Sequence, residues 1–417
     1  MRVGIEAMNV FGGSAVVDVI ELARHRQLDR GRLDNLLMKE KSVALPFEDP
    51  VTFAVNAARP LIDRLTPAER ARIELVITCS ESGIDFSKSL STYVHAQLGL
   101  ERNCRMFELK QACYAGTAGL HMACNFILAR TSPGAKALVI AADISRFILE
   151  PGTQVANQDW AYAEPSGGAG AVAMLVSDDP RVFQLDVGAS GYYGHEVMDT
   201  CRPAPDSEAG DVDLSLMSYL ECCEKAYLEY QARVPGSDYR DTFGYLAFHT
   251  PFGGMVKGAH RTMMRKLARA RPDEIARDFE RRVMPGLAYC QRVGNVMGAT
   301  IFLSLASTVC NGEFTAPRRI GCFSYGSGCC SEFYSGVVTP DGAAALRALD
   351  LAGGLDRRQR LSLAAYDRLL QDSGFVRFGT RNLELDLALA AELPRATGPR
   401  LLLRGIRNFH REYVWRE

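Results

Sequence analysis

The chain lacks long hydrophobic runs. No apolar stretch in its 417 residues approaches the ~20 residues that a membrane-spanning helix needs. The N-terminus, MRVGIEAMNVFGG, carries charge at once and has no apolar core of the kind found in a secretory signal. We therefore expect a cytoplasmic protein with no membrane segment.

An excess of charge of either sign is also missing. Lys and Arg together number 48 and Asp and Glu 49, which gives a net charge of −1. Nucleic acids and anionic membrane surfaces attract proteins through a strong basic field. Neither is an expected partner.

Cysteine is present but lacks the spacing of a metal site. None of the 12 cysteines forms a CxxC pair, and the two vicinal pairs, Cys222–Cys223 and Cys329–Cys330, do not have zinc-ligand spacing. Thiols scattered through apolar segments are typical of reduced, buried side chains. The sequence predicts no metal site.

What is present is a set of short apolar runs that end in polar or glycine-rich residues. Runs of this length are typical of buried strands. The expected strands are 73–80, 136–143, 169–177, 245–251 and 319–328. A chain of this length predicts two domains or one duplicated unit.

Helical patterns lie between these strands. Residues 50–65 have helical spacing with proline in the first turn, whereas residues 115–130 and 294–310 are apolar on most faces, as buried helices are. Because strand and small-residue helix recur in each half, we expect a duplicated α/β unit with helices inside it. Residues 202–213 are predicted as a polar loop and residues 268–283 as a charged, solvated helix.

Cys113 stands at the start of one predicted buried helix, in QACYAGTAGL. A helix N-terminus stabilises a thiolate and can bind an oxyanion. The small residues that follow would leave room for a thioester on a pantetheine arm. A packed core thiol is the alternative, since most cysteines in such a chain are of that kind.

Two further residues lie at the ends of predicted strands. Glu81 stands in a Ser/Gly turn after residues 73–80, and His249 precedes Thr250 and Pro251. Open α/β sheets build their sites at such strand ends, so both side chains are candidates for acid–base roles. A solvated glutamate and a capped core histidine are the alternatives.

The motifs around these residues resemble those of the 3-hydroxy-3-methylglutaryl-CoA synthase family, in the thiolase superfamily. The resemblance extends from GIEAMNVFGG to GSGCCSEFYSG. The segments that carry it are SESGIDFSKS, QACYAGTAGL, FHTPFGGMVKGAH, SGGAGAVAMLV, QRVGNVMGAT and FSYGSG.

The resemblance implies a fold and a site. The fold is an αβαβα sandwich of two pseudo-duplicated halves in one compact unit, which we divide at residues 1–180 and 181–417. Cys113 would be the acyl-accepting nucleophile, Glu81 the general acid/base and His249 the residue on the acceptor side. Asn295, Ser327 and Lys257 are the expected substrate-binding residues. Members are usually homodimers.

One departure from the mevalonate-pathway pattern points to a branch of the family. Those synthases usually have a CoA-binding lysine at the position of Gly254, whereas Lys257 is retained here. The stretches around Gly254 and over residues 35–53 are similar to the synthases of polyketide gene clusters. These use a donor and an acceptor acyl carrier protein to install β-branches and need no cofactor beyond the carriers' phosphopantetheine.

Three other interpretations stay open at this point. A mevalonate-pathway synthase that uses acetyl-CoA and acetoacetyl-CoA would keep Glu81, Cys113 and His249. A decarboxylating ketoacyl synthase would need a second His or an Asn partner, and the Glu81 segment argues against it. A non-catalytic thiolase-fold partner of a multienzyme complex would have no use for the three residues.

Overall fold

A mixed sheet of nine strands runs through the computed structural model in the order β11-β12-β13-β8-β1-β7-β6-β4-β5. The structure describes residues 2–145, 163–204, 207–371, 376–391, 393 and 398–416. All five predicted strands are present, as β4, β6, β7, β11 and β12. The nine strands are β1 Gly4–Phe11, β4 Ile73–Cys79, β5 Arg105–Leu109, β6 Lys136–Ile144, β7 Ala169–Ser177, β8 Phe183–Gly194, β11 Tyr245–Phe248, β12 Arg318–Gly326 and β13 Cys330–Val338.

The sheet repeats one pairing pattern in its two halves. In the first, β4 and β6 pair in parallel, and β7 and β1 follow antiparallel. In the second, β11 and β12 pair in parallel, and β13 and β8 follow antiparallel. A short antiparallel contact of Gly4 and Ile5 with Gln184 and Phe183 joins the halves. The predicted pseudo-duplication is confirmed.

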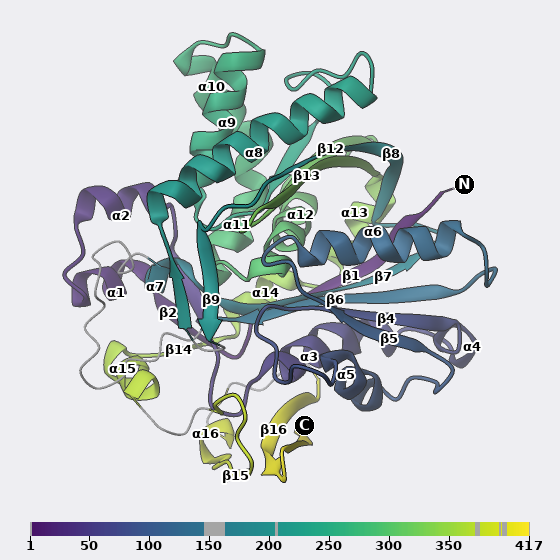
Figure 1. Cartoon of the computed structure of the whole chain (residues 1–417), viewed down its shortest axis with the longest axis vertical. Coiled ribbons are helices and arrows are strands. Elements are labelled where there is room, and N and C mark those ends of the chain that lie inside the picture. Colours follow the sequence, from purple (N-terminus) through teal and green to yellow (C-terminus); the bar gives the residue numbers. More distant parts are fainter. Residues whose placement is uncertain are drawn as a thin grey trace.

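Helices complete five layers (Figure 1). One apolar cluster joins the helices α6 and α12 to the strands of both halves. A second lies between the first half and α3 and α5, and a third between the second half and α8 and α9. The order is therefore αβαβα, as expected. The helices are α3 Pro50–Ile62, α5 Leu90–Leu98, α6 Ala115–Leu128, α8 Val212–Arg233, α9 Gly253–Leu267 and α12 Thr300–Asn311.

The central helices meet through glycines. A Cβ atom on Gly116 would lie 2.2 Å from the carbonyl oxygen of Gly298, and one on Gly119 would lie 2.5 Å from Cys79 Sγ. The small residues after Cys113 therefore serve helix–helix and helix–sheet packing. The expectation that small residues beside Cys113 leave room for a pantetheine arm stays a prediction.

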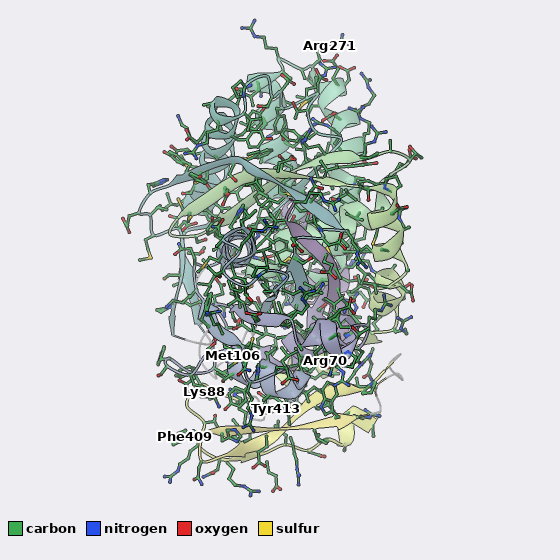
Figure 2. All side chains as sticks on the ribbon, turned by 90° about the vertical axis from the view of Figure 1, so that its right-hand side faces the viewer. Arg70, Lys88, Met106, Arg271, Phe409 and Tyr413 are labelled. Carbon is green, nitrogen blue, oxygen red and sulfur yellow. The ribbon has the colours of Figure 1, made fainter. Side chains whose placement is uncertain are left out.

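The C-terminal segment returns to the first half of the molecule. Strand β14 pairs with β2 (Ala15–Asp18), and a hairpin of β16 and β17 packs against α3, where Asn56 exchanges two hydrogen bonds with Leu401. Figure 2 shows Phe409 of this hairpin and Arg271 at opposite ends of the molecule. The elements are α13 Pro340–Arg347, α14 Leu351–Asp356, β14 Gln359–Arg360, α15 Leu363–Gln371, β15 Leu383–Glu384, α16 Ala388–Ala391, β16 Arg400–Arg407 and β17 His410–Arg416.

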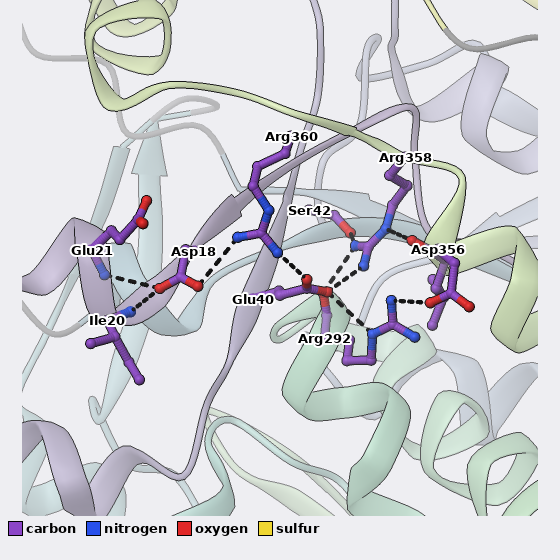
Figure 3. A network of polar contacts seen from close by, with 10 residues as sticks. Asp18, Ile20, Glu21, Glu40, Ser42, Arg292, Asp356, Arg358 and Arg360 are labelled. Atoms are coloured by element: carbon purple, nitrogen blue, oxygen red, sulfur yellow. Dashed lines mark hydrogen bonds and ion pairs between the residues drawn. The ribbon is translucent and has the colours of Figure 1, made fainter.

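A network of ion pairs ties the same segment to both halves (Figure 3). Glu40 accepts hydrogen bonds from Arg358 at 2.9 Å, from Arg360 at 2.7 Å and from Arg292 at 3.2 Å. Glu40 belongs to the predicted segment 1–180 and the three arginines belong to the segment 181–417. These ion pairs therefore connect the two predicted segments. The predicted boundary at residue 180 falls between β7 and β8, and the division into two segments stays a prediction.

The segment predicted as a charged, solvated helix is partly buried. It begins as α10 Pro272–Asp278 and continues as η2 Phe279–Val283 and α11 Met284–Val293. Arg282 is only 1% exposed and pairs with Asp278, which also lies 3.1 Å from His260 Nε2. The prediction is wrong for these two charges because each satisfies the other inside the core.

The remaining elements are short. They are α1 Val19–His25, α2 Arg30–Leu36, α4 Pro67–Arg70, α7 Ala163–Ser166, β2 Ala15–Asp18, β3 Glu40–Val43, β9 Thr200–Ala204, β10 Ser207–Gly210 and η3 Met297–Ala299. Residues 202–213, predicted as a loop, thus contribute a two-stranded hairpin. In the part of the chain that is described, none of the helices has the length and apolar character needed to span a bilayer.

Candidate active site

A pocket of about 1380 Å³ opens where the strands of both halves end. Five of the six predicted site residues line it: Glu81, Cys113, His249, Asn295 and Ser327. Glu81 follows β4, Cys113 follows β5, His249 follows β11 and Ser327 follows β12. The carboxyl ends of parallel strands meet at one edge of a sheet, which is why residues so far apart in sequence converge here.

Lys257 is the exception. It is an exposed residue of α9, and its Nζ lies 5.9 Å from the centroid of the Phe279 ring. It is not among the residues that line the pocket. The structure does not bring Lys257 to the other five.

Cys113 sits on a tight turn just before α6. The preceding Ala112 has a φ of 43°, in the left-handed region that a non-glycine residue adopts only under constraint. The amides of Tyr114 and Ala115 donate to the carbonyls of Gln111 and Ala112. These two amides are thus engaged within the turn, so we do not assign the oxyanion-binding role to them.

The buried carboxylate of Glu332 stabilises the turn that carries Cys113. The hydroxyl of Tyr114 donates to Glu332 Oε2 at 2.6 Å, and His121 Nε2 lies 3.1 Å from Glu332 Oε1. Burial, and then the nearby Glu332, raise the pKa of Tyr114, so the phenol remains a donor. A Cβ on Gly326 would lie 2.7 Å from Gln111 O, so glycine at the end of β12 lets the turn approach.

Glu81 is positioned by residues on two other elements. Asp143, at the end of β6, accepts hydrogen bonds on Oδ1 from the Glu81 amide at 2.9 Å and from the Ser80 and Ser82 hydroxyls. Arg202, on β9, brings its Nε to 3.4 Å from Glu81 Oε1. The hydrogen bonds to Asp143 therefore fix the turn, and the Glu81 carboxylate faces the Arg202 guanidinium.

His249 is buried and neutral. Its side chain is 1% exposed, and burial lowers its pKa to about 3. Its backbone carbonyl accepts from Tyr219, and Nδ1 has no hydrogen-bond partner among the described residues. A neutral imidazole carries one N–H donor, so His249 can donate a hydrogen bond to a substrate oxygen without being charged.

Asn295 and Ser327 are oriented by local hydrogen bonds. Asn295 Oδ1 accepts from the Met297 amide at 3.1 Å and from Thr300 Oγ1 at 3.0 Å. These donors fix the amide flip and leave its NH₂ group to contact a ligand. Ser327 Oγ accepts from Thr200 Oγ1 at 2.7 Å, which fastens the β9–β10 hairpin to the pocket wall.

Sequence reasoning missed three residues of this environment. Asp143 ends a predicted strand, and a buried strand that closes on an acid was the available signal. Arg202 fell in a predicted loop. Asp199, just before β9, accepts from Tyr325 at 2.5 Å and from the Gly328 amide at 2.9 Å, and no sequence pattern marks it.

Gly254, the departure noted in the sequence, lies near the N-terminus of α9. A Cβ on Gly254 would lie 1.8 Å from the carbonyl oxygen of Asn35. Asn35 and Leu36, on α2, line the pocket. A side chain at residue 254 would therefore displace α2, so the glycine is required by the close approach of that helix.

Taken together, the pocket holds a thiol on a constrained turn, a carboxylate beside a guanidinium and a neutral imidazole. A thiol can accept an acyl group, a carboxylate can remove a proton from the carbon next to a thioester, and an imidazole can donate to the oxygen that gains charge. The arrangement suits carbon–carbon bond formation through an acyl-enzyme.

Two family models match the chain. Residues 1–180 match "Hydroxymethylglutaryl-coenzyme A synthase N terminal", and residues 262–376 match "Hydroxymethylglutaryl-coenzyme A synthase C terminal". The first match contains Glu81 and Cys113. Together the matches cover most of the sequence.

Relatives of known function differ in similarity. The chain is 66% identical over 414 residues to the polyketide biosynthesis 3-hydroxy-3-methylglutaryl-ACP synthase PksG of Bacillus subtilis, covering 99% of each. It is 32% identical to a hydroxymethylglutaryl-CoA synthase of Enterococcus faecalis, covering 94% of this chain and 96% of the relative. A crystal structure of the curacin biosynthetic pathway HMG synthase in complex with holo donor-ACP matches with a TM-score of 0.95 and 65% identity over 100% of both chains. The chain belongs to the hydroxymethylglutaryl-CoA synthase family.

Proposed function

We propose that this enzyme adds an acetyl group from a donor acyl carrier protein to the β-ketone of a β-ketoacyl group on an acceptor carrier protein. Hydrolysis then gives a 3-hydroxy-3-methylglutaryl-type product, the β-branch of a polyketide. The observation that carries the proposal is the convergence of Glu81, Cys113 and His249 in one pocket. The chain is 66% identical to a polyketide biosynthesis 3-hydroxy-3-methylglutaryl-ACP synthase and 32% identical to a hydroxymethylglutaryl-CoA synthase, which supports carrier proteins over CoA as the acyl donors.

In the first step, the Cys113 thiolate attacks the carbonyl carbon of the acetyl thioester. The carbon–sulfur bond to the donor's pantetheine breaks, and the pantetheine thiol leaves with a proton. The product is an acetyl thioester on Cys113. The positive end of α6 favours the thiolate, because Cys113 lies immediately before that helix.

In the second step, Glu81 removes a proton from the acetyl methyl group and the resulting carbon attacks the acceptor's ketone. His249 donates a hydrogen bond to the ketone oxygen as it gains charge, and the proton held by Glu81 returns to that oxygen. The Arg202 guanidinium lies beside the Glu81 carboxylate and attracts its negative charge.

In the third step, water attacks the thioester on Cys113, the carbon–sulfur bond breaks, and the new carboxylate, the free thiol and one proton are released. The three steps are an acyl transfer, an addition of carbon to a ketone and a hydrolysis, and none of them requires an external oxidant or reductant. The proposed reaction therefore needs no metal or redox cofactor beyond the phosphopantetheine arms of the carriers.

The pocket rim supports a protein as the source of the acyl group. Phe86, Met198 and Val212 line the pocket and are exposed, Phe86 to 90%. Exposed apolar side chains around a pocket mark a surface that another protein can cover. A homodimer and a cytoplasmic location stay predictions.

The test follows the mass of the intact protein. Acetylated donor carrier should add one acetyl group to the wild type and none to Cys113→Ala. Glu81→Gln should load acetyl but form no product with an acetoacetyl carrier. Efficient turnover of acetyl-CoA with acetoacetyl-CoA and slow loading from every carrier would instead favour the mevalonate-type reaction. Loading of Cys113→Ala would reject the proposed nucleophile.

A further inference from the structure

Three side chains with metal-binding atoms meet beside the pocket. His195 follows β8, Cys222 lies on α8 and Cys329 stands between β12 and β13. Cys222 Sγ lies 3.5 Å from Cys329 Sγ, and Cys329 Sγ lies 3.6 Å from His195 Nδ1. All three atoms lie within 4.8 Å of one another.

Two of the three separations between these atoms match those of a zinc site. Zinc binds sulfur at about 2.3 Å and imidazole nitrogen at about 2.0 Å with tetrahedral angles. That geometry separates two sulfur ligands by about 3.8 Å and a sulfur and a nitrogen ligand by about 3.5 Å. The observed separations of 3.5 Å and 3.6 Å are within a few tenths of an ångström of these values.

We propose that His195, Cys222 and Cys329 bind one zinc ion, with water as the fourth ligand. The sequence predicted no metal site because the vicinal cysteine pairs lack ligand spacing. The cluster takes one cysteine from each pair and adds a histidine, so it exists only in the folded chain. Two thiolates and an imidazole are ligands that zinc prefers.

Access and charge are consistent with this role. Cys222 is fully buried and Cys329 is 8% exposed, whereas His195 is exposed and gives the ion a path from solvent. Zinc replaces the two thiol protons, so the two thiolates neutralise the two positive charges of the ion. Because zinc binding displaces the thiol protons of Cys222 and Cys329, binding should weaken as the pH falls.

The site would join three elements that shape the pocket wall. The Cys329 amide donates to the His195 carbonyl at 2.6 Å, and the Val197 amide donates to the Gly328 carbonyl at 2.7 Å. Val197 and Gly328 line the pocket, but the three proposed ligands do not. Zinc would therefore hold α8 against this wall without taking part in the reaction.

The test is a zinc titration of the metal-free, reduced, full-length protein, read by calorimetry and by native mass spectrometry. The wild type should take up one ion. His195→Ala, Cys222→Ser and Cys329→Ser should lose this binding. The matched controls are Cys223→Ser and Cys330→Ser, each of which changes the neighbour of a proposed ligand and should retain it. His195→Ala removes an exposed side chain, so it answers the question even where a buried cysteine variant fails to fold.

Cobalt and thermal unfolding give independent readouts. Co²⁺ should produce the visible absorption of a tetrahedral thiolate site in the wild type and not in His195→Ala. Zinc should raise the unfolding temperature of the wild type only. The proposal is overturned by no zinc uptake, by uptake that depends on Cys113 but not on His195, or by a Cys222–Cys329 disulfide in a protein that binds no zinc when reduced.

Discussion

Arg202 reaches from the β9–β10 hairpin to Glu81 on the turn after β4, with its Nε 3.4 Å from Glu81 Oε1. The two side chains are 15% and 16% exposed, so water screens the pair only in part. Arg202 Nη1 also donates to Ser82 Oγ at 3.3 Å. The hairpin therefore positions the proposed base.

Replacing Arg202 should separate acetyl loading from condensation. Arg202→Met keeps much of the side-chain volume but removes the cation that faces Glu81. Loading of Cys113 should stay within about twofold of the wild type, while condensation should fall by about 10²-fold, the scale of a general-base effect. Rapid-quench measurements of the two steps give the ratio. A matched loss of both steps would show that Arg202 acts on the donor site instead.

Asp143 is a positioning residue for the same turn. Its Oδ1 accepts from the amides of Glu81 and Ser82 and from two hydroxyls. Asp143→Ala leaves these donors without an acceptor, which should cost about 1–3 kcal/mol of unfolding free energy and slow condensation. Asp143→Asn keeps an acceptor oxygen and should restore part of the rate. Urea unfolding and the condensation rate are measured together. Equal rates in the two variants would argue against positioning through Oδ1.

The strand ends were predictable from sequence because each depends on a local pattern. Apolar runs of strand length end just before Glu81 and at His249, and the constrained turn at Cys113 precedes a helix of small residues. The layered arrangement was also predictable from the sequence, because helices that are apolar on most faces must lie inside the fold. The thiolase-like arrangement of these elements came from the family's motifs.

Other features depend on contacts between distant segments, which no local pattern contains. Arg202 reaches Glu81 only because the hairpin folds over the pocket. Arg282 has the composition of a surface residue, and its partner Asp278 is what allows it to be buried. Gly254 was interpreted as a lost charge, whereas its local requirement is the nearby carbonyl oxygen of Asn35.

The burial of His249 predicts a pH effect on stability. The folded protein holds the pKa of His249 near 3, and the unfolded chain should titrate near 6.5. Between these values the unfolded state binds one more proton, so acid should destabilise the fold by up to about 1.4 kcal/mol per pH unit through this residue. Unfolding free energies of the wild type and His249→Gln, measured from pH 4.5 to 7.5, should converge at low pH. Parallel curves would mean that His249 has the same pKa in the folded protein as in the unfolded chain.

Gly254 should not tolerate a side chain. Gly254→Ala places a Cβ 1.8 Å from the Asn35 carbonyl, so α2 must move and the unfolding free energy should fall by about 1–3 kcal/mol. Gly258→Ala, on the same helix, is the matched control because nothing lies within 4 Å of its Cβ. The control should gain about 0.5–1 kcal/mol from helix propensity. Thermal or urea unfolding of both variants measures these changes in stability. A Gly254→Ala variant as stable as the wild type would mean that α2 is free to shift.

The rim of the pocket should distinguish a protein-bound donor from a free one. Met198 lines the pocket and is 62% exposed, whereas Met217 is 67% exposed and does not line it. If a carrier protein covers the rim, Met198→Glu buries a charge on docking and repels an acidic partner. Acetylation of Cys113 by acetyl carrier should then slow about tenfold, equivalent to ~1.4 kcal/mol. Acetylation by acetyl-pantetheine, which has no protein surface, should keep its rate, and Met217→Glu should behave as the wild type with both donors.

Two outcomes would contradict this prediction. Equal slowing with both donors would place Met198 in contact with the pantetheine arm, and an unchanged rate with the carrier would exclude this part of the rim from docking.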